Sequence, residues 1–303
     1  MSIGSMIEIN DPADPRIGVF LNQKDAWLKA AHNPAHNPAH NPAHKPEGRP
    51  GGPDDHGRFI AEGVLVVEHL LDSAFPVESI FVSHSRVSGV RPLLAKVPDG
   101  IPVYVAEQSL MDQIVGFPIH RGLLACGKRL PNPDPLELAR ACRVLVVLED
   151  LSNHDNVGSV FRSVAALGGA GVGVLLSERC CDPLYRKALR VSMGHVLRVP
   201  HAVSDNLIAL MLRLHALGFT SYGLSPDPSV EPLSSLRFND TDQSVLCFGA
   251  EGPGLSEELM QSVHHRVRIP MANGVDSLNI AVAAAVTLYA CAARASDGPR
   301  EHA

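Results

Sequence analysis

The chain has 303 residues, of which 45% are hydrophobic, and its 32 acidic and 26 basic residues give a formal net charge of −6. This length suggests two domains or one large domain, and the apolar fraction is enough for a substantial core. These figures exclude a wholly disordered chain and a small disulfide-stapled scaffold, and they disfavour a globally basic nucleic-acid binder.

The six cysteines show no C-x-x-C spacing, so a zinc ribbon and a redox dithiol have no support and we expect no metal. Scattered cysteines are typical of buried thiols in a reducing cytoplasm, which is the expected location. The start of the chain, MSIGSMIEIN, lacks the basic and apolar regions of a signal peptide. The longest apolar stretch, 280–293, is shorter than the ~20 residues of a membrane span and predicts a buried helix, not a membrane partner.

Residues 32–46 repeat the tetrapeptide HNPA and carry a proline at every fourth position. These prolines forbid the helix on which the four histidines would align, so the segment is predicted to be an extended linker. Metal binding by His32, His36, His40 and His44 is the functional interpretation, and an expanded repeat without a role is the favoured one. Residues 1–57 are therefore assigned to an N-terminal arm and a disordered His/Pro linker.

From residue 58 the apolar pattern indicates a small α/β domain that ends near residue 130, before three closely spaced prolines. The expected strands are 78–83, 102–105 and 122–126. The expected helices are 61–72, 92–96 and a segment that is capped by Ser109 and ended by Gly116.

A second domain is predicted over residues 142–296, followed by a tail, 297–303. The expected strands are 144–148, 172–176, 197–199, 219–224, 245–248 and 266–269. The expected helices are 158–167, one capped by Asp182, one from Ser204 to Gly218, one after Ser256 and one from about Leu278. Strands that alternate with helices predict a parallel sheet covered on both faces.

Three loops that follow strands carry residues typical of ligand sites, and ligands of open α/β sheets bind beyond the carboxyl ends of strands. The first, NHDNVGSVFR, places Asn156 at a helix start and Arg162 further along the helix. The second, GAEGPGLS, has glycines that permit close backbone approach, but not in dinucleotide-binding or P-loop spacing. The third places Ser277 and Asn279 at another helix start. Taken singly, Asn156 is equally well interpreted as a cap, and a serine at the position of Ser277 is usually just a cap.

Together the three loops resemble motifs one, two and three of the SpoU/TrmH family of RNA ribose 2′-O-methyltransferases, in the SPOUT superfamily. Motif one, N-x-G-x-x-x-R, corresponds to Asn156, Gly158 and Arg162; motif two resembles GAEGPGLS, and motif three resembles residues 269–283. Many members have Asp-Pro before the motif-one Asn, whereas this chain has the residues SNHD there. Residues 58–129 resemble, more weakly, the family's N-terminal substrate-binding domain.

The resemblance implies an α/β fold with a deep trefoil knot in the C-terminal domain, a homodimer formed through that domain, and S-adenosylmethionine as cofactor. The implied activity is methyl transfer to a ribose 2′-hydroxyl of structured RNA, either tRNA or rRNA. The implied catalytic residues are Arg162, Asn156, Glu251, Ser277 and Asn279, and the implied cofactor-binding residues are Gly249, Gly252, Ile269, Met271 and Leu278. A guanidinium is always protonated, so we expect Arg162 to hold the RNA phosphate and stabilise the developing alkoxide.

The net charge conceals local basic clusters, because residues 179–201 hold five basic residues against one acidic residue. RNA contacts are expected from Arg179, Arg186, Lys187, Arg190 and Arg121. Two alternatives stay open: a non-catalytic RNA-binding or assembly protein on a methyltransferase fold, and an RNA base methyltransferase. A dinucleotide-dependent oxidoreductase fails on the glycine spacing.

Overall fold

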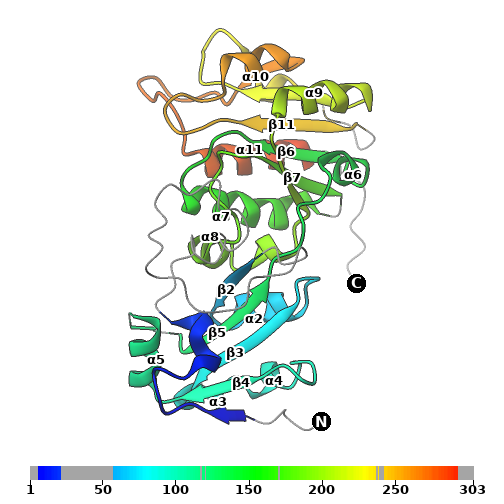
Figure 1. Ribbon diagram of the computed structural model, residues 1–303. Helices are drawn as coiled ribbons and strands as arrows, with labels where there is room; N and C mark the ends of the chain where they lie inside the picture. The colour runs from blue at the N-terminus through cyan, green and yellow to red at the C-terminus, as the bar shows by residue number, and fades with distance from the viewer. Residues whose placement is uncertain are drawn as a thin grey trace, which may run out of the picture. The chain divides into compact units, whose positions relative to one another are not determined.

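The computed structural model describes residues 6–21, 57–116, 118–119, 121–169, 171–236, 238 and 242–292. They fall into two compact units (Figure 1). The first contains the described residues up to Pro131 together with Leu184–Leu197, and the second contains Asn132–Pro183 and the residues from Arg198 onward. The HNPA repeat and the predicted tail lie outside the described residues.

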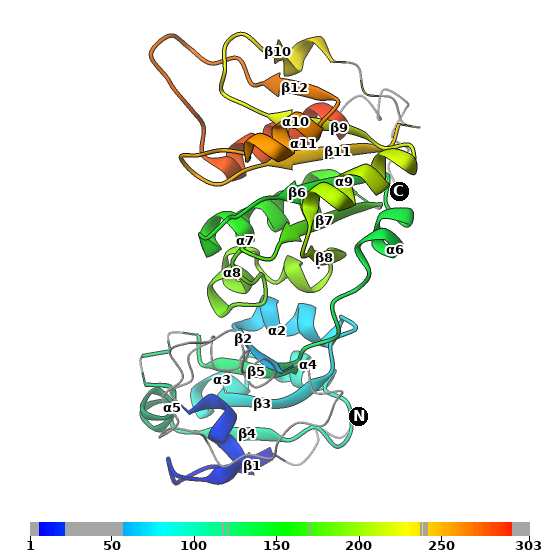
Figure 2. The ribbon, with the colours of Figure 1, turned by 45° about the horizontal axis from the view of Figure 1, so that its top comes forward.

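The first unit is built on a five-stranded sheet in the order β1–β4–β3–β5–β2 (Figure 2). The strands are β1 (Met6–Glu8), β2 (Arg58–Glu62), β3 (Val77–Ser83), β4 (Val103–Ala106) and β5 (Leu123–Lys128). Strands β1, β4 and β3 are parallel, and β5 runs antiparallel to both β3 and β2. The carboxyl ends of β1, β2, β3 and β4 therefore meet at one edge of the sheet.

Short helices surround this sheet. They are η1 (Pro15–Phe20), α2 (Val64–Leu71), α3 (His84–Val87), α4 (Arg91–Leu94), α5 (Gln108–Val115), α8 (Arg186–Val191) and η5 (His195–Leu197). Helix α8 packs against β2, and the His195 ring of η5 lies 4.9 Å from the His69 ring of α2. The segment Leu184–Leu197 thus belongs to the first unit by its contacts, although the chain on both sides of it belongs to the second.

The three strands predicted for the first domain are confirmed within one or two residues. The helix predicted from residue 61 begins only at Val64, because residues 58–62 pair with β5 as a strand. Ser109 is not the cap of α5, since the helix already begins at Gln108 and Glu107 precedes it. The predicted stop at Gly116 is correct.

The described part of the predicted N-terminal arm belongs to the core of the first unit. Strand β1 pairs with β4, and the side chains of Ile9, Ile17 and Phe20 are buried. The ring of Phe20 lies 5.4 Å from that of Phe81 in β3, in the same apolar cluster. Residues 6–21 are therefore structural, and the separation of an arm from the globular part does not hold for them.

The second unit is built on a seven-stranded sheet in the order β10–β12–β9–β11–β6–β7–β8, in which every neighbouring pair is parallel. The strands are β6 (Val144–Leu148), β7 (Val172–Ser177), β8 (His201–Ser204), β9 (Thr220–Leu224), β10 (Glu231–Pro232), β11 (Ser244–Phe248) and β12 (His265–Arg268). All five residues of β6 are buried, as its continuous apolar sequence predicts for a central parallel strand.

Helices cover both faces of this sheet, as predicted. They are α6 (Pro135–Arg140), α7 (His154–Ser163), η4 (Val164–Gly168), α9 (Leu207–Ala216), η6 (Leu233–Ser235), α10 (Glu257–Ser262) and α11 (Ile280–Ala292). Helices α6, α9 and α10 share one apolar cluster with Leu145, Val147 and Val245. Side chains of a strand alternate between the two faces of the sheet. The opposite face is covered by α7, η4 and α11, which pack together. The predicted α/β architecture is confirmed.

Several predicted boundaries in the second unit are wrong. The helix predicted from Asp182 begins at Arg186, because Asp182 and Pro183 are buried in the preceding loop. The strand predicted at 197–199 lies four residues later, as β8, because Leu197 is the last residue of η5. Asn206 rather than Ser204 caps α9, by accepting a 2.9 Å hydrogen bond from the Ala209 N–H. None of the described helices combines the length and apolarity that a membrane crossing requires.

Replacing Phe20 with Ala tests whether the N-terminal segment supports the first unit. Loss of this buried ring is expected to lower the free energy of unfolding by about 3–5 kcal/mol, since a large cavity is left. Urea denaturation of the full chain measures the change. The matched control is Leu21→Ala, because Leu21 is 46% exposed and its loss should cost less than about 0.5 kcal/mol. Equal effects of the two substitutions would contradict a core role for Phe20.

Candidate functional site

Three loops meet at the carboxyl edge of the parallel sheet of the second unit. Residues 149–153 follow β6, residues 249–256 follow β11, and residues 269–279 follow β12. Strand β11 lies between β6 and β9, in register with all five residues of β6. The first two loops therefore leave the sheet side by side, at the kind of edge where α/β proteins bind ligands.

A chain of amide hydrogen bonds links these loops. The Asn279 Nδ2 donates to Asn156 Oδ1 at 3.0 Å, and the Asn156 Nδ2 donates to Glu251 Oε1. Asn279 Nδ2 also lies 3.5 Å from Glu251 Oε1. The orientation of the Asn279 amide is fixed, since its Oδ1 accepts a 2.9 Å bond from the Ala281 N–H at the start of α11. The structure thus brings together three of the five predicted catalytic side chains.

The sequence suggested that Asn156 caps α7. The structure instead places Asn156 within the first turn of that helix. Asn153 is the cap, and its side chain accepts a 2.9 Å hydrogen bond from the Asp155 N–H. The helix therefore begins four residues earlier than predicted, and Asn156 is only 5% exposed. A buried amide needs partners, and Glu251 and Asn279 supply them.

The glycine-rich loop folds back on itself directly after β11. Ala250 accepts a 3.0 Å hydrogen bond from the Gly254 N–H, and a Cβ built on Gly249 would overlap the backbone of Gly254 and Leu255. Only glycine fits at position 249 for this reason. The close approach leaves Glu251 at the tip of the loop, where it meets Asn156 and Asn279.

The base of the same loop is fixed by Glu149, a residue that the sequence analysis missed. The carboxylate of Glu149 is buried at the end of β6 and accepts two hydrogen bonds from Ser256, one from its N–H and one from its hydroxyl, both 2.7 Å long. Ser256 also caps α10, as predicted. An acidic residue directly after a buried strand was the signal that could have identified Glu149.

Asp150, the next residue, is a second one that the sequence analysis missed. It adopts a positive φ of 59°, which is uncommon for a residue other than glycine. Its N–H donates to Ser177 Oγ at 2.9 Å, its carboxylate accepts from the same hydroxyl at 2.8 Å, and Arg179 donates to its other oxygen. Burial opposes ionisation, but the hydrogen bonds from Arg179 and Ser177 outweigh it and lower the pKa of Asp150.

The predicted cofactor-binding residues all lie on the loops at this edge. Gly249 is buried after β11, and Gly252 occupies an exposed turn. Ile269 and Met271 are half-buried after β12, and Leu278 is exposed just before α11. The loops thus present apolar side chains and backbone groups at this edge of the sheet.

Arg162 and Ser277 do not join the amide chain. Arg162 lies six residues after Asn156 on α7, which places the two side chains about 120° apart around the helix. Its guanidinium is exposed and forms no hydrogen bond or ion pair with any residue that the structure describes. Ser277 is likewise exposed, and Asn279 takes the capping position at α11.

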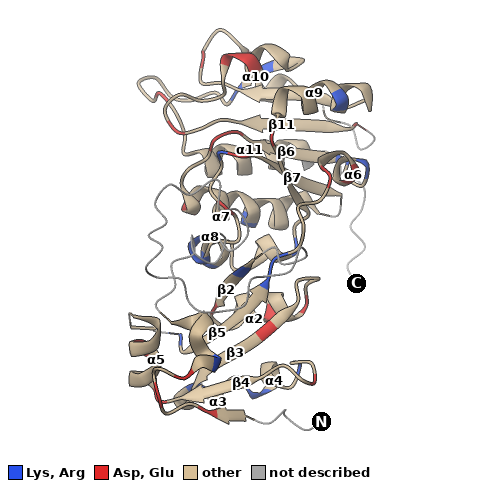
Figure 3. Cartoon of the chain, in the orientation of Figure 1, with Lys and Arg blue, Asp and Glu red and all other residues tan. Residues whose placement is uncertain are grey.

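The predicted RNA-binding residues are divided between the two units. Arg179 lies in the second unit, paired with Asp150. Arg186, Lys187 and Arg190 form a basic surface on α8, which belongs to the first unit (Figure 3). Arg121 also belongs to the first unit, where its side chain lies against Gly63 at the end of β2. Among the described residues, no group of three or more His, Cys, Asp or Glu side chains is arranged to hold a metal.

A wholly parallel sheet, with a polar cluster and a glycine-rich loop beyond its carboxyl edge, defines the second unit as a ligand-binding α/β domain. A model of the SpoU rRNA methylase family matches residues 143–289. An uncharacterised tRNA/rRNA methyltransferase of Mycobacterium bovis is 38% identical over 238 residues, which are 78% of this chain and 81% of that protein. The chain belongs to the SpoU rRNA methylase family, as the three motifs predicted.

Two solved structures share the fold. One is an rRNA methyltransferase from Sinorhizobium meliloti with bound AdoMet, which has a TM-score of 0.69 and 20% identity, over 94% of this chain and 97% of that chain. Another is described as an RNA 2′-O ribose methyltransferase, with a TM-score of 0.65 and 19% identity, over 95% of this chain and 99% of that chain.

Gly249→Ala tests whether the close approach within the glycine-rich loop maintains the site. The added Cβ would displace Gly254, so we expect faster amide hydrogen exchange over residues 249–256 and a lower melting temperature. The matched control is Gly252→Ala, since a Cβ there has open space and only the positive φ of 89° opposes it. Its cost should be about 1 kcal/mol. If the Gly249 variant changed exchange no more than this control, the loop would not depend on the contact.

Proposed function

We propose that this protein transfers a methyl group from S-adenosylmethionine to a ribose 2′-hydroxyl of tRNA or rRNA. The observation that carries the proposal is the chain of hydrogen bonds from Asn279 through Asn156 to Glu251. It joins polar residues of all three motifs by which the sequence resembles ribose methyltransferases. Membership of the SpoU family supports methyl transfer to RNA. The cytoplasmic location expected from the cysteines is part of the same proposal.

The loops at the carboxyl edge fit S-adenosylmethionine by the chemistry that they present. A Cβ built on Gly252 or Gly254 would have no atom within 4 Å, so the backbone of the loop is open to close approach there. Ile269, Met271 and Leu278 offer apolar surface for an adenine ring, and backbone groups near Gly249 and Gly252 offer hydrogen bonds. When bound, the cofactor supplies an electrophilic methyl group on a positively charged sulfur.

The side chains of the motifs then have to place and activate the ribose. The 2′-oxygen must be held in line with the methyl group and must lose its proton. In this proposal Arg162 holds an RNA phosphate and stabilises the developing alkoxide, as an exposed and permanently charged group can. The ribose is positioned by Asn156, Glu251 and Asn279. Ser277, in the turn before Asn279, helps to position it.

Two further features of the family belong to the proposal. The deep trefoil knot that the resemblance implies stays a prediction for this chain. A homodimer formed by the second unit is supported by α11, which exposes Val282, Val286 and Tyr289 along one face. Their spacing of four and three residues makes a continuous apolar stripe, while the opposite face of α11 packs on α7 and η4.

The proposed reaction is tested by mapping ribose 2′-O-methylation in tRNA and rRNA from cells with and without the gene. Loss of one 2′-O-methyl mark, restored by the wild-type gene, is the expected result. Loss of a base methyl group instead would favour a base methyltransferase. An unchanged pattern of marks, with S-adenosylmethionine still bound by the purified protein, would favour a non-catalytic RNA-binding role.

Arg162→Ala separates catalysis from cofactor binding. Because Arg162 lies outside the amide chain and off the cofactor loops, its loss should leave the Kd for S-adenosylmethionine within about twofold. Turnover should fall about 100-fold or more, since a positively charged group near a developing alkoxide is removed. Single-turnover rates and calorimetry give the two quantities. Near-normal turnover would exclude a catalytic role for Arg162.

Tyr289→Glu tests the proposed homodimer. Tyr289 is 63% exposed in the single chain, so a charge there is tolerated by the monomer but would be buried in a dimer. Sedimentation velocity should show a shift from dimer to monomer. Leu212→Glu is the matched control, because Leu212 is 64% exposed on α9, outside this stripe. A dimer that survives Tyr289→Glu would place the interface elsewhere.

A further inference from the structure

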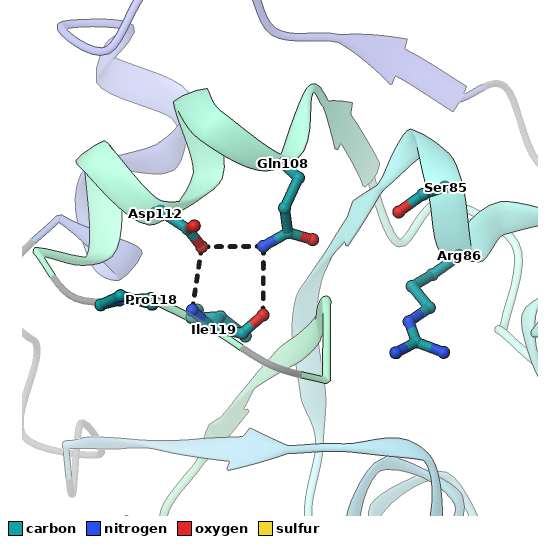
Figure 4. A pocket seen from close by; sticks show the side chains of 6 residues that line it. All are labelled: Ser85, Arg86, Gln108, Asp112, Pro118 and Ile119. Atoms are coloured by element: carbon teal, nitrogen blue, oxygen red, sulfur yellow. Dashed lines mark hydrogen bonds between the residues drawn. The ribbon is translucent and has the colours of Figure 1, made fainter.

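The first unit contains a cavity of about 360 Å³ that the proposed reaction does not use. It is lined by Ser85, Arg86, Gln108, Asp112, Pro118 and Ile119 (Figure 4). Ser85 and Arg86 lie on α3 directly after β3, and Gln108 and Asp112 lie on α5 directly after β4. Because β3 and β4 are parallel neighbours, both segments leave the sheet at its carboxyl edge, where ligand sites form.

One wall of the cavity is fixed by three hydrogen bonds. Gln108 Nε2 donates to Asp112 Oδ1 at 2.7 Å and to the Ile119 carbonyl oxygen at 3.1 Å. The Ile119 N–H donates to the same Asp112 oxygen at 2.9 Å. Both N–H groups of the Gln108 amide are therefore engaged, and its Oε1 is held as an acceptor.

The opposite wall carries donors. The Ser85 hydroxyl, which shares a 3.2 Å hydrogen bond with Ser83 Oγ, and the Arg86 guanidinium lie on the side toward which the Gln108 oxygen points (Figure 4). A cavity with a carboxylate in its lining does not suit a small anion alone, because Asp112 would repel it. A cavity with an arginine in its lining does not suit a small cation. The mixture suits a neutral heterocycle that has donors and acceptors on its edge and a phosphate attached to it.

We propose that this cavity binds one unstacked nucleotide of the RNA substrate. The base edge bonds to Gln108 Oε1 and Asp112 on one wall, and Arg86 and Ser85 bind its phosphate or its acceptors on the other. Proteins recognise single-stranded RNA in this way, by hydrogen bonds to splayed-out bases and by arginine contacts. The volume lies within the range of about 300–1,000 Å³ that small-molecule sites occupy. That the ligand belongs to RNA rests on the proposed function.

The presence of a nucleotide site is tested without RNA or methyl transfer. The full chain is titrated with guanosine 5′-monophosphate, ribose 5-phosphate and inorganic phosphate, while NMR follows the backbone amide of Ile119 and the side-chain amide of Gln108. Saturable shifts with the nucleotide, in the millimolar range, and clearly weaker shifts with the other two probes are expected. No saturable shift, or equal shifts with ribose 5-phosphate, would overturn the proposal.

Variants then connect the cavity to RNA. Arg86→Ala should weaken binding of total RNA from cells that lack the gene about tenfold in filter binding, since a charged hydrogen bond is lost. Arg91→Ala is the matched control, because Arg91 is exposed on α4 of the same unit and does not line the cavity. Equal weakening by both would indicate non-specific charge and contradict the nucleotide site.

The outcome is separable from that of the proposed function. The affinity for S-adenosylmethionine should be unchanged by Arg86→Ala. If the wild-type protein did not bind S-adenosylmethionine, the proposed reaction would be excluded, but the response of Ile119 to the nucleotide would still stand. Conversely, normal methyl transfer with no response to the nucleotide at Gln108 and Ile119 would leave the reaction standing and exclude the cavity as a nucleotide site.

Discussion

The second unit depends on one chain of amide hydrogen bonds, from Asn279 through Asn156 to Glu251. It joins residues that lie 123 and 95 positions apart in the sequence. Asn156 is buried, so the loss of either partner would leave an amide group without compensation. The start of α11 and the tip of the glycine-rich loop are thereby tied to the first turn of α7.

The glycine-rich loop is consequently held at both ends. Glu149 fixes its base through Ser256, and Asn156 fixes its tip through Glu251. A buried carboxylate such as Glu149 requires donors of this kind, so the contact serves the stability of the sheet and the shape of the loop at once. Preorganisation of a loop before its ligand arrives reduces the entropy lost on binding.

The sequence was most informative where a residue's surroundings are uniform. The five apolar residues of β6 predict a buried parallel strand because both of its faces meet helices. Strand β1 was missed and β8 was predicted four residues too early, since strands of three or four residues form through pairing with distant segments and leave little local pattern. The residue types of the amide chain were predictable from the motifs. Their proximity was not derivable, because it follows from the insertion of β11 between β6 and β9.

The segment Leu184–Leu197 has a consequence for the order in which the protein can be built. Most of the first unit precedes the second in the sequence, yet α8 packs on β2 and His195 lies against His69, and both come only after β6 and β7. Domains tend to fold as they leave the ribosome, from the N-terminus onward. Here the first unit cannot complete its packing until residue 197 has been synthesised, which is after β6 and β7, two of the seven strands of the parallel sheet. Translation therefore interleaves the two units, and a ribosome stalled before residue 184 would expose the face of β2 that α8 covers.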